Sequence, residues 1–167
     1  MALSESLLPE FDSEVKATRR LLERVPDSGG AWKPHDKSMT MGKLAIHIAN
    51  LIGWVGVVVH ETELDLRPAN GHAVTQPQFE STARTLETFD ANVIAARAAL
   101  AGATDDALMV AWSLKAGAHT IMTMPRIAVL RSMVMNHVIH HRGQLSVYLR
   151  LNDVAVPGVY GPSADES

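Results

Sequence analysis

The stretch His137-Val138-Ile139-His140-His141-Arg142-Gly143-Gln144 lies within a long run of apolar residues at helical spacing. This run predicts a final helix that begins with Pro125 as its first residue and reaches Leu151. Because residues i and i+4 project from the same side of a helix, His137 and His141 share one face. That face forms a stripe consisting of Leu130, Val134, His137, His141, Leu145 and Tyr148. Both histidines are therefore expected to point into the protein core.

Three further segments have the length and period of helices. The first covers about 3–25, the second follows the predicted N-cap Thr40 and includes 44–59, and the third begins at 75–78 and ends near Gly102. In the second segment Val57–Val59 favours a strand locally, whereas the period and length favour a helix. The buried side of the third segment is predicted to hold Phe79, Leu86, Phe89, Val93, Ile94 and Leu100.

Polar residues and helix-breaking residues between these segments indicate the connections. Residues 64–77 form a polar connection, 105–114 a short helix or turn, and 115–118 a hairpin-like loop followed by a short strand at 120–124. An irregular tail follows Leu151. We therefore predict an all-α protein, a four-helix bundle with a short hairpin-like excursion before the last helix.

Composition limits the class of protein. A chain of 167 residues with 47% hydrophobic and 20% charged residues is long enough for one domain, 1–167, with a full core. The net charge of −3 disfavours nucleic acid as a partner, and the absence of cysteine excludes disulfides and thiolate ligands. The N-terminus lacks the pattern of a secretion signal. The longest apolar stretch, Leu44–Val59, is interrupted by His47 and is judged too short to span a bilayer. These features predict a soluble, cytoplasmic protein without a membrane partner.

The histidines suggest a metal site. His47 lies on an apolar face of the second predicted helix, and two buried imidazoles one turn apart are costly unless each has a partner. A divalent ion shared by His47, His137 and His141 would satisfy all three, and three neutral imidazoles suit zinc or nickel with coordination positions left open. Two alternatives stay open: each histidine could be a hydrogen-bonded core residue, and His140 could replace His141 in the pair with His137. Asn50, one turn from His47, is a candidate for fixing an imidazole tautomer.

Four other residues near these histidines have two interpretations each. Arg142 is expected to pair with a carboxylate or cap another segment. Gly143 is expected to allow close approach of another helix, although it could instead provide clearance beside the metal. Gln144 could line a pocket or pack in the core. Trp32 is expected to plug the core from a loop, although it could instead cover the mouth of a pocket.

Three segments together resemble the DinB family, within the DinB/YfiT-like metalloenzymes, and the similarity covers nearly the whole chain. The segments are Trp32-Lys33-Pro34-His35-Asp36-Lys37-Ser38, Gly42-x-Leu44-Ala45-x-His47-Ile48-Ala49 and Asn136-His137-x-x-His140-His141-Arg142-Gly143-Gln144-Leu145. The resemblance implies a bundle of up-down-down-up topology, often a homodimer. It also implies that His47, His137 and His141 bind a divalent metal, usually zinc or nickel. Members of the family include thiol-dependent transferases and isomerases, which makes a low-molecular-weight thiol a candidate co-substrate.

Two functions follow as hypotheses. The first is a metal-dependent enzyme acting on a small molecule, either a thiol S-transferase or a hydrolase, in which the ion is a Lewis acid. The helix stripes near the site offer no obvious carboxylate as a general base, which favours thiol transfer. The second is a non-catalytic, metal-stabilised bundle that acts as a binding or stress-related protein. A purely structural site would normally have a fourth protein ligand, and the sequence shows none at matching spacing.

Overall fold

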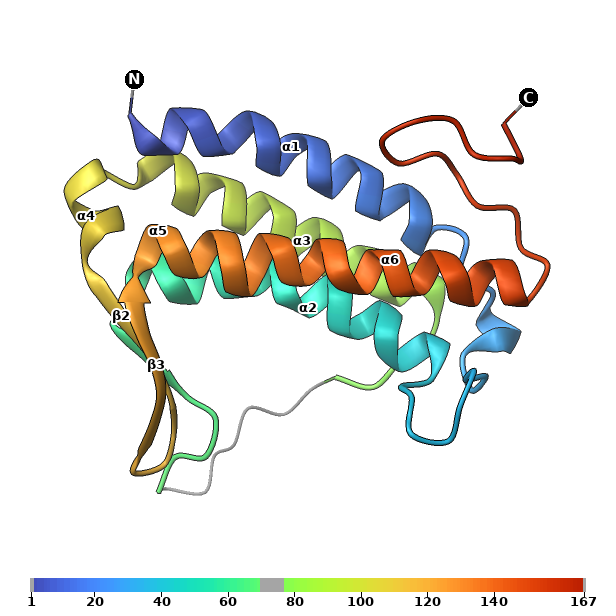
Figure 1. Cartoon of the computed structure of the whole chain (residues 1–167), viewed down its shortest axis with the longest axis horizontal. Helices are drawn as coiled ribbons and strands as arrows, with labels where there is room; N and C mark the ends of the chain where they lie inside the picture. The colour runs from blue at the N-terminus through green and yellow to red at the C-terminus, as the bar shows by residue number, and fades with distance from the viewer. Residues whose placement is uncertain (1, 70–76, 167) are drawn as a thin grey trace.

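The computed structural model describes residues 2–69 and 77–166, and its main feature is a set of four long helical segments (Figure 1). In chain order these segments run up, down, down and up along the length of the molecule (Figure 1). They are α1 (Leu3–Leu22), α2 (Met41–His60), α3 (Thr82–Gly102) and a continuous last segment made of α5 (Arg126–Val129), the π-helical turn η2 (Leu130–Met135) and α6 (Asn136–Leu151). The short helices η1 (Asp27–Gly29) and α4 (Asp105–Met109) lie in the connections.

A small sheet at one end of the helices corrects the all-α prediction. It contains β1 (Glu63–Asp65), β2 (Ala111–Ala116) and β3 (His119–Pro125) in the order β1-β2-β3. β1 pairs with β2 in parallel, and β2 pairs with β3 in an antiparallel hairpin. The fold is therefore mostly helical with a three-stranded sheet, not a pure four-helix bundle.

The hairpin before the last helix was predicted, whereas β1 and β2 were not. The predicted short helix or turn at 105–114 holds only for Asp105–Met109. From Ala111 onward the chain alternates, and Trp112 and Leu114 bury their side chains while Ser113 is partly exposed. This two-residue period is that of a strand with one buried face. β1 has only three residues, and its partner lies far away in the sequence, so no local pattern marks it.

The predicted boundaries of the helices hold at α2 and fail at α3. The Thr40 side-chain oxygen accepts the backbone N–H of Lys43 at 3.2 Å, as expected of an N-cap. The segment 57–59 is helical despite its valines, because Val58 is buried among the other helices. The third helix begins only at Thr82, where Ser81 is the cap. Of the predicted start, 75–76 lies outside the described residues and Pro77 is not helical.

Two predicted core positions of the third helix also need correction. Ile94 is 71% exposed and lies on the outer side of α3. Phe79 precedes the helix and is only partly buried. Phe89 and Leu100 are buried as predicted, together with Thr85, Ala96 and Ala99. The buried face of α3 thus consists largely of small residues, which allow α2 and α1 to pack closely against it.

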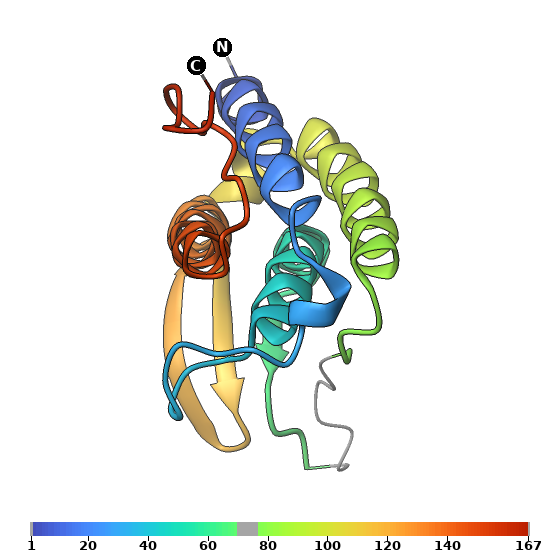
Figure 2. The same ribbon diagram turned by 90° about the vertical axis from the view of Figure 1, so that its right-hand side faces the viewer.

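Helix α2 occupies the centre of the fold, between α3 and the last helix (Figure 2). It is 20 residues long and, among the helices described, the one that is long and apolar enough to cross a bilayer by length and composition. The prediction that this stretch is too short is therefore wrong. Of its apolar window, 56% is buried inside the fold, which is typical of a core helix.

Gly143 provides a test of helix energetics. It lies on the exposed side of α6, and a Cβ atom there would meet no atom within 4 Å apart from the helix backbone. The prediction that Gly143 permits close packing is therefore wrong. We expect Gly143→Ala to raise the free energy of unfolding by about 0.5–1 kcal/mol, because alanine restricts the unfolded chain and favours the helix. Urea denaturation measures the change.

Gly42→Ala is the matched control in α2. A Cβ atom at this buried position would lie 2.6 Å from the ring of Phe79, so Phe79 would have to move and stability should fall. Equal effects of the two substitutions, in either direction, would contradict this account of the two glycines.

Candidate metal centre

Three histidines from two helices meet inside the fold. His47 comes from α2, and His137 and His141 come from successive turns of α6. The ring centroids are 5.4 Å apart for His47 and His137, 4.7 Å for His47 and His141, and 4.6 Å for His137 and His141. One nitrogen from each ring lies within 4.8 Å of the other two. The three residues selected from the sequence are thus brought together.

His140 does not join this group. Its ring centroid is 4.9 Å from that of His141, but its side chain is exposed on the neighbouring face of α6. His141, in contrast, is only 8% exposed and continues the apolar stripe of the helix. The structure therefore favours the pair His137 and His141 over the pair His137 and His140. The histidines His35, His60 and His119 are exposed as expected, and His72 lies outside the described residues.

Hydrogen bonds at Nδ1 orient two of the three rings. The Nδ1 atom of His141 is 2.7 Å from Oε1 of Gln144, and the Nδ1 atom of His137 is 3.3 Å from the backbone oxygen of Met133. Since both oxygens are acceptors, each ring carries its proton on Nδ1 and leaves the Nε2 lone pair available. Contacts of this kind are the usual outer support of metal-binding histidines.

The role of Gln144 was missed by the sequence prediction, which placed it in a pocket or in the core. The available signal was its position three residues after His141, a spacing at which side chains on a helix meet. Asn50, which was proposed for such a role, makes no hydrogen bond through its buried Nδ2 atom within the described part of the chain.

Burial keeps the imidazoles neutral. Burial, together with the smaller effect of the nearby histidine rings, lowers the pKa of His141 to about 4, against the opposing effect of the hydrogen bond that its Nδ1–H donates to Gln144. Burial likewise lowers the pKa of His137, opposed by the Met133 carbonyl. Neutral imidazole is the form that binds metal ions. At neutral pH these two rings need no deprotonation before they can act as ligands.

The lowered pKa of His141 predicts a pH dependence of the metal-free protein. Its folded-state pKa of about 4 lies below the ordinary value of 6.5, so the unfolded chain binds more protons between these pH values. Stability from this group is then fully present above about pH 6.5 and is lost as the pH falls toward 4. An NMR titration of the His141 ring without metal should show the low pKa. Acid unfolding of His141→Gln should show a weaker dependence over the same range, and an ordinary pKa for His141 would contradict the prediction.

The π-helical turn η2 directly precedes the histidines of α6. It spans Leu130–Met135, and the acceptor of the His137 ring, Met133, belongs to it. A π turn contains an additional residue per turn, so it rotates the following helix relative to the preceding one, and such turns are frequent at functional sites. The turn therefore helps to set the direction in which His137 and His141 face.

Arg142 anchors the other side of this helix segment. Its side chain is 3% exposed and its Nη1 atom lies 2.7 Å from Oε2 of Glu14 on α1. Its Nη2 atom donates to the hydroxyl of Tyr160 in the C-terminal tail at 2.5 Å, and that hydroxyl also lies 3.0 Å from Glu14. The predicted pairing of Arg142 with a carboxylate is confirmed. It fixes α6 next to His141 against both α1 and the tail.

Trp32 packs as a plug near the end of α6. Its ring meets the ring of buried Tyr148 edge to face, with centroids 5.5 Å apart, and its backbone oxygen accepts the N–H of Met41 at 2.8 Å. Both contacts fix the 30–40 loop at the start of α2. The interpretation of Trp32 as a plug over the core is the one these contacts favour.

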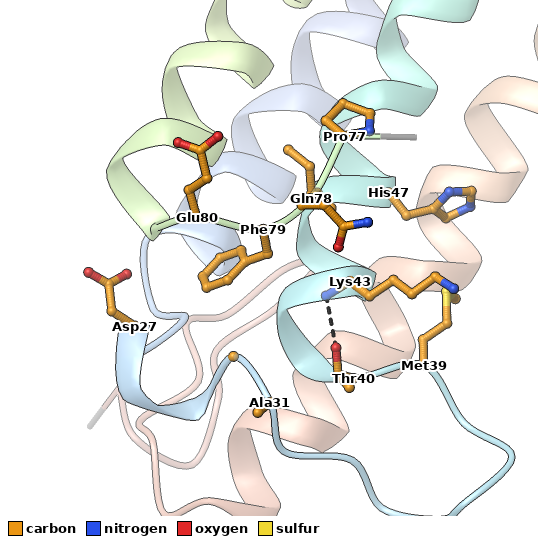
Figure 3. Close-up of a pocket in the computed structure, with 12 residues that line it drawn as sticks. Asp27, Ala31, Met39, Thr40, Lys43, His47, Pro77, Gln78, Phe79 and Glu80 are labelled. Carbon is orange, nitrogen blue, oxygen red and sulfur yellow. Dashed lines mark hydrogen bonds between the residues drawn. The ribbon is translucent and has the colours of Figure 1, made fainter. Parts of the chain in front are cut away.

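A cavity of about 780 Å³ adjoins His47 (Figure 3). It is formed by the first half of α2, the loop around Gly30 and the segment that leads into α3. It is lined by Asp27, Gly30, Ala31, Met39, Thr40, Lys43, Ile46, His47, Pro77, Gln78, Phe79 and Glu80. Its size is in the range of small-molecule sites.

Four long helical segments, a small sheet and three converging histidines define a mostly helical protein with a candidate metal centre. The family model described as "DinB family" matches residues 1–167. The chain therefore belongs to the DinB family.

The similar proteins agree with this assignment. The uncharacterized protein YrdA of Bacillus subtilis (strain 168) is 27% identical over 172 residues, which covers 97% of this chain and 90% of YrdA. A DinB-like protein from Bacillus cereus ATCC 10987 superimposes with a TM-score of 0.67 at 22% identity, covering 95% of this chain and 98% of that one. A DinB-like protein from Bacillus subtilis superimposes with a TM-score of 0.69 at 20% identity, covering 97% and 99%. At these identities the two structures support the fold.

Proposed function

We propose that His47, His137 and His141 bind one divalent metal ion, zinc or nickel, and that the protein is a metal-dependent enzyme of the thiol S-transferase type. The observation that supports this most is the convergence of three ring nitrogens within 4.8 Å of one another. A shared cation would bind the Nε2 lone pairs that the hydrogen bonds of His137 and His141 at Nδ1 leave available.

The residues present fit such an ion. Two nitrogens bound to zinc at about 2.1 Å in a tetrahedral arrangement lie about 3.4 Å apart, so small side-chain rotations would close the group. The rings of His137 and His141 already hold their protons on the far nitrogen, toward Met133 and Gln144. All three candidate ligands are imidazoles, which suit zinc and nickel better than magnesium or calcium.

When bound, the ion would supply a Lewis acid that lowers the pKa of a coordinated thiol or water. The protein residues would supply position. Gln144 would hold the His141 ring in the orientation that aims Nε2 at the ion, and Arg142 would fix the same helix turn against α1. Within residues 2–69 and 77–166 no fourth His, Asp or Glu belongs to the group. A coordination position is then left for a substrate atom.

Thiol transfer is preferred to hydrolysis because a carboxylate base is missing from the group among the described residues. Glu14, which contacts the helix turn of His141 through Arg142, is paired with that arginine. Asp27 and Glu80 line the cavity on the side away from the His47 ring (Figure 3). Hydrolysis by a metal-bound water molecule usually needs a positioned general base, whereas a metal-bound thiolate is itself the nucleophile.

The alternative is a non-catalytic bundle in which the ion joins α2 to α6. The absence of a fourth ligand within the described group supports the enzyme instead, because structural zinc sites are normally closed by four protein ligands. A homodimer and a cytoplasmic location remain predictions, as does the choice between zinc and nickel.

The test is metal content followed by thiol binding. Purified protein loaded with zinc should hold one ion per chain, and a thiol such as mercaptoethanol should bind to the loaded protein and not to protein stripped with a chelator. In cobalt-substituted protein the thiol should produce a sulfur-to-cobalt charge-transfer band. Zinc binding without any thiol band would favour the structural alternative, and no zinc binding would refute the proposal.

A further inference from the structure

Of the three converging histidines, His47 is the one that lines the 780 Å³ cavity. Its ring points away from Phe79 and toward the last helix, so that α2 carries it between the cavity and the histidine group (Figure 3). A molecule in the cavity would therefore have one end next to the proposed metal. The other lining residues then decide which molecules fit.

Lys43 places a positive charge at this end of the cavity. It lies four residues before His47 on α2, so the two side chains are neighbours on one helix face. Figure 3 shows the Lys43 ammonium group extending to the same side as the His47 ring. Among the described residues no carboxylate forms an ion pair with Lys43.

The two acids of the cavity lie away from Lys43. Asp27 and Glu80 line its opposite side (Figure 3), and Oδ1 of Asp27 accepts the backbone N–H of Thr82 at 2.7 Å. The cavity is thus positive next to His47 and negative at the other side. A negative group of a ligand is favoured only at the Lys43 side.

The remaining wall is apolar and held in place by two glycines. A Cβ atom at Gly30 would lie 2.7 Å from the Phe79 ring, and one at Gly42 would lie 2.6 Å from it. Phe79 can rest on the loop and on α2 only because both residues lack side chains. Together with Met39 and Ile46, it offers a surface for the hydrocarbon part of a ligand.

We propose that this cavity is the substrate site and that its substrate carries a carboxylate, which Lys43 binds while the reacting end reaches the metal beside His47. The proposal rests on the proposed function, since it needs the metal to place the reacting end. The ammonium group donates charge-assisted hydrogen bonds to the carboxylate, and the apolar wall contacts the hydrocarbon part of the substrate. Lys43 is then a specificity-determining residue.

The experiment compares two thiols of similar length on the zinc-loaded protein. Mercaptohexanoate has a carboxylate at the end remote from sulfur, and mercaptohexanol has a neutral hydroxyl there. Isothermal titration calorimetry should show mercaptohexanoate binding about tenfold tighter, as expected for one charge-assisted contact. This preference should shrink as the salt concentration rises.

Lys43→Gln should abolish the preference, so that the variant binds mercaptohexanoate and mercaptohexanol with equal affinity. Lys37→Gln is the matched control, because Lys37 is an exposed lysine in the preceding loop that does not line the cavity, and it should keep the preference. Equal affinities of the two thiols for the unaltered protein, or a preference that survives Lys43→Gln, would overturn the proposal for Lys43 and leave the metal site standing.

If the proposed function is wrong, the result is different, because mercaptohexanol then does not bind in a zinc-dependent manner. A second measurement then still tests Lys43. Hexanoate added to metal-free protein should shift the NMR signals of Phe79 and the methyl group of Met39, and these shifts should be absent with hexanol or in Lys43→Gln. Identical shifts with hexanoate and hexanol would overturn the assignment of a carboxylate site.

Discussion

Replacing His141 with alanine is expected to weaken zinc binding by at least about 100-fold, because loss of even an outer-shell partner of a metal ligand costs about 10–100-fold. Any thiol-dependent activity should disappear with the metal. The fold should remain, since the apolar residues of α2 and α6 that form the core are unchanged. Zinc affinity is measured by competition with a chromophoric chelator, and the fold by far-ultraviolet circular dichroism.

His140→Ala is the matched control for this substitution. It removes an imidazole from the adjacent position of the same helix, but one that is exposed and outside the converging group. Zinc affinity should change little. A loss of zinc binding in His140→Ala equal to that in His141→Ala would show that His140 is a ligand and would refute the assignment of His141. Unfolding of His141→Ala, with no activity found for the parent protein, would favour a structural ion.

Replacing Arg142 with methionine is expected to lower the free energy of unfolding by about 3 kcal/mol. The physical reason is that Glu14, whose side chain is 14% exposed, would keep a buried charge without its partner, and breaking one side of a buried pair costs about 3–5 kcal/mol. Tyr160 would also lose the donor that holds the tail. Urea denaturation gives the change from the midpoint at constant slope.

Arg150→Met is the comparison, since Arg150 pairs with Asp165 at the surface, where its side chain is 50% exposed. Exposed pairs contribute about 0–1 kcal/mol, so this variant should lose much less stability. Adding Glu14→Gln to Arg142→Met should restore part of the loss by removing the stranded charge. If the two arginine variants are equally stable, the buried network contributes no more than a surface pair.

The two substitutions with the largest expected effects, at His141 and Arg142, change opposite faces of one turn of α6. His141 faces the converging histidines, and Arg142, the next residue, faces α1 and the tail. Loss of Arg142 would therefore remove a contact that fixes the turn on which His141 lies. We expect its effect on zinc affinity to be small beside that of His141, because His141 retains its own hydrogen bond to Gln144.

Helix periodicity was sufficient to predict the long helices and the three converging histidines. An apolar stripe records which face of a helix is buried, so it placed His137 and His141 in the core before any contact was known. The same stripe distinguished His141 from His140. Thr40 as a cap was equally local, because a cap depends on residues within one turn.

The tertiary structure decided the features that depend on residues far apart in the chain. Strand β1 exists through its pairing with β2, some fifty residues later, and three residues carry no period of their own. The π turn before α6 left no mark in the sequence, so its effect on the direction of His137 was not predictable. The cavity joins α2 to the segment before α3, where Phe79 rests on Gly30 and Gly42. Local pattern determines which residues are buried, whereas packing determines which of them meet.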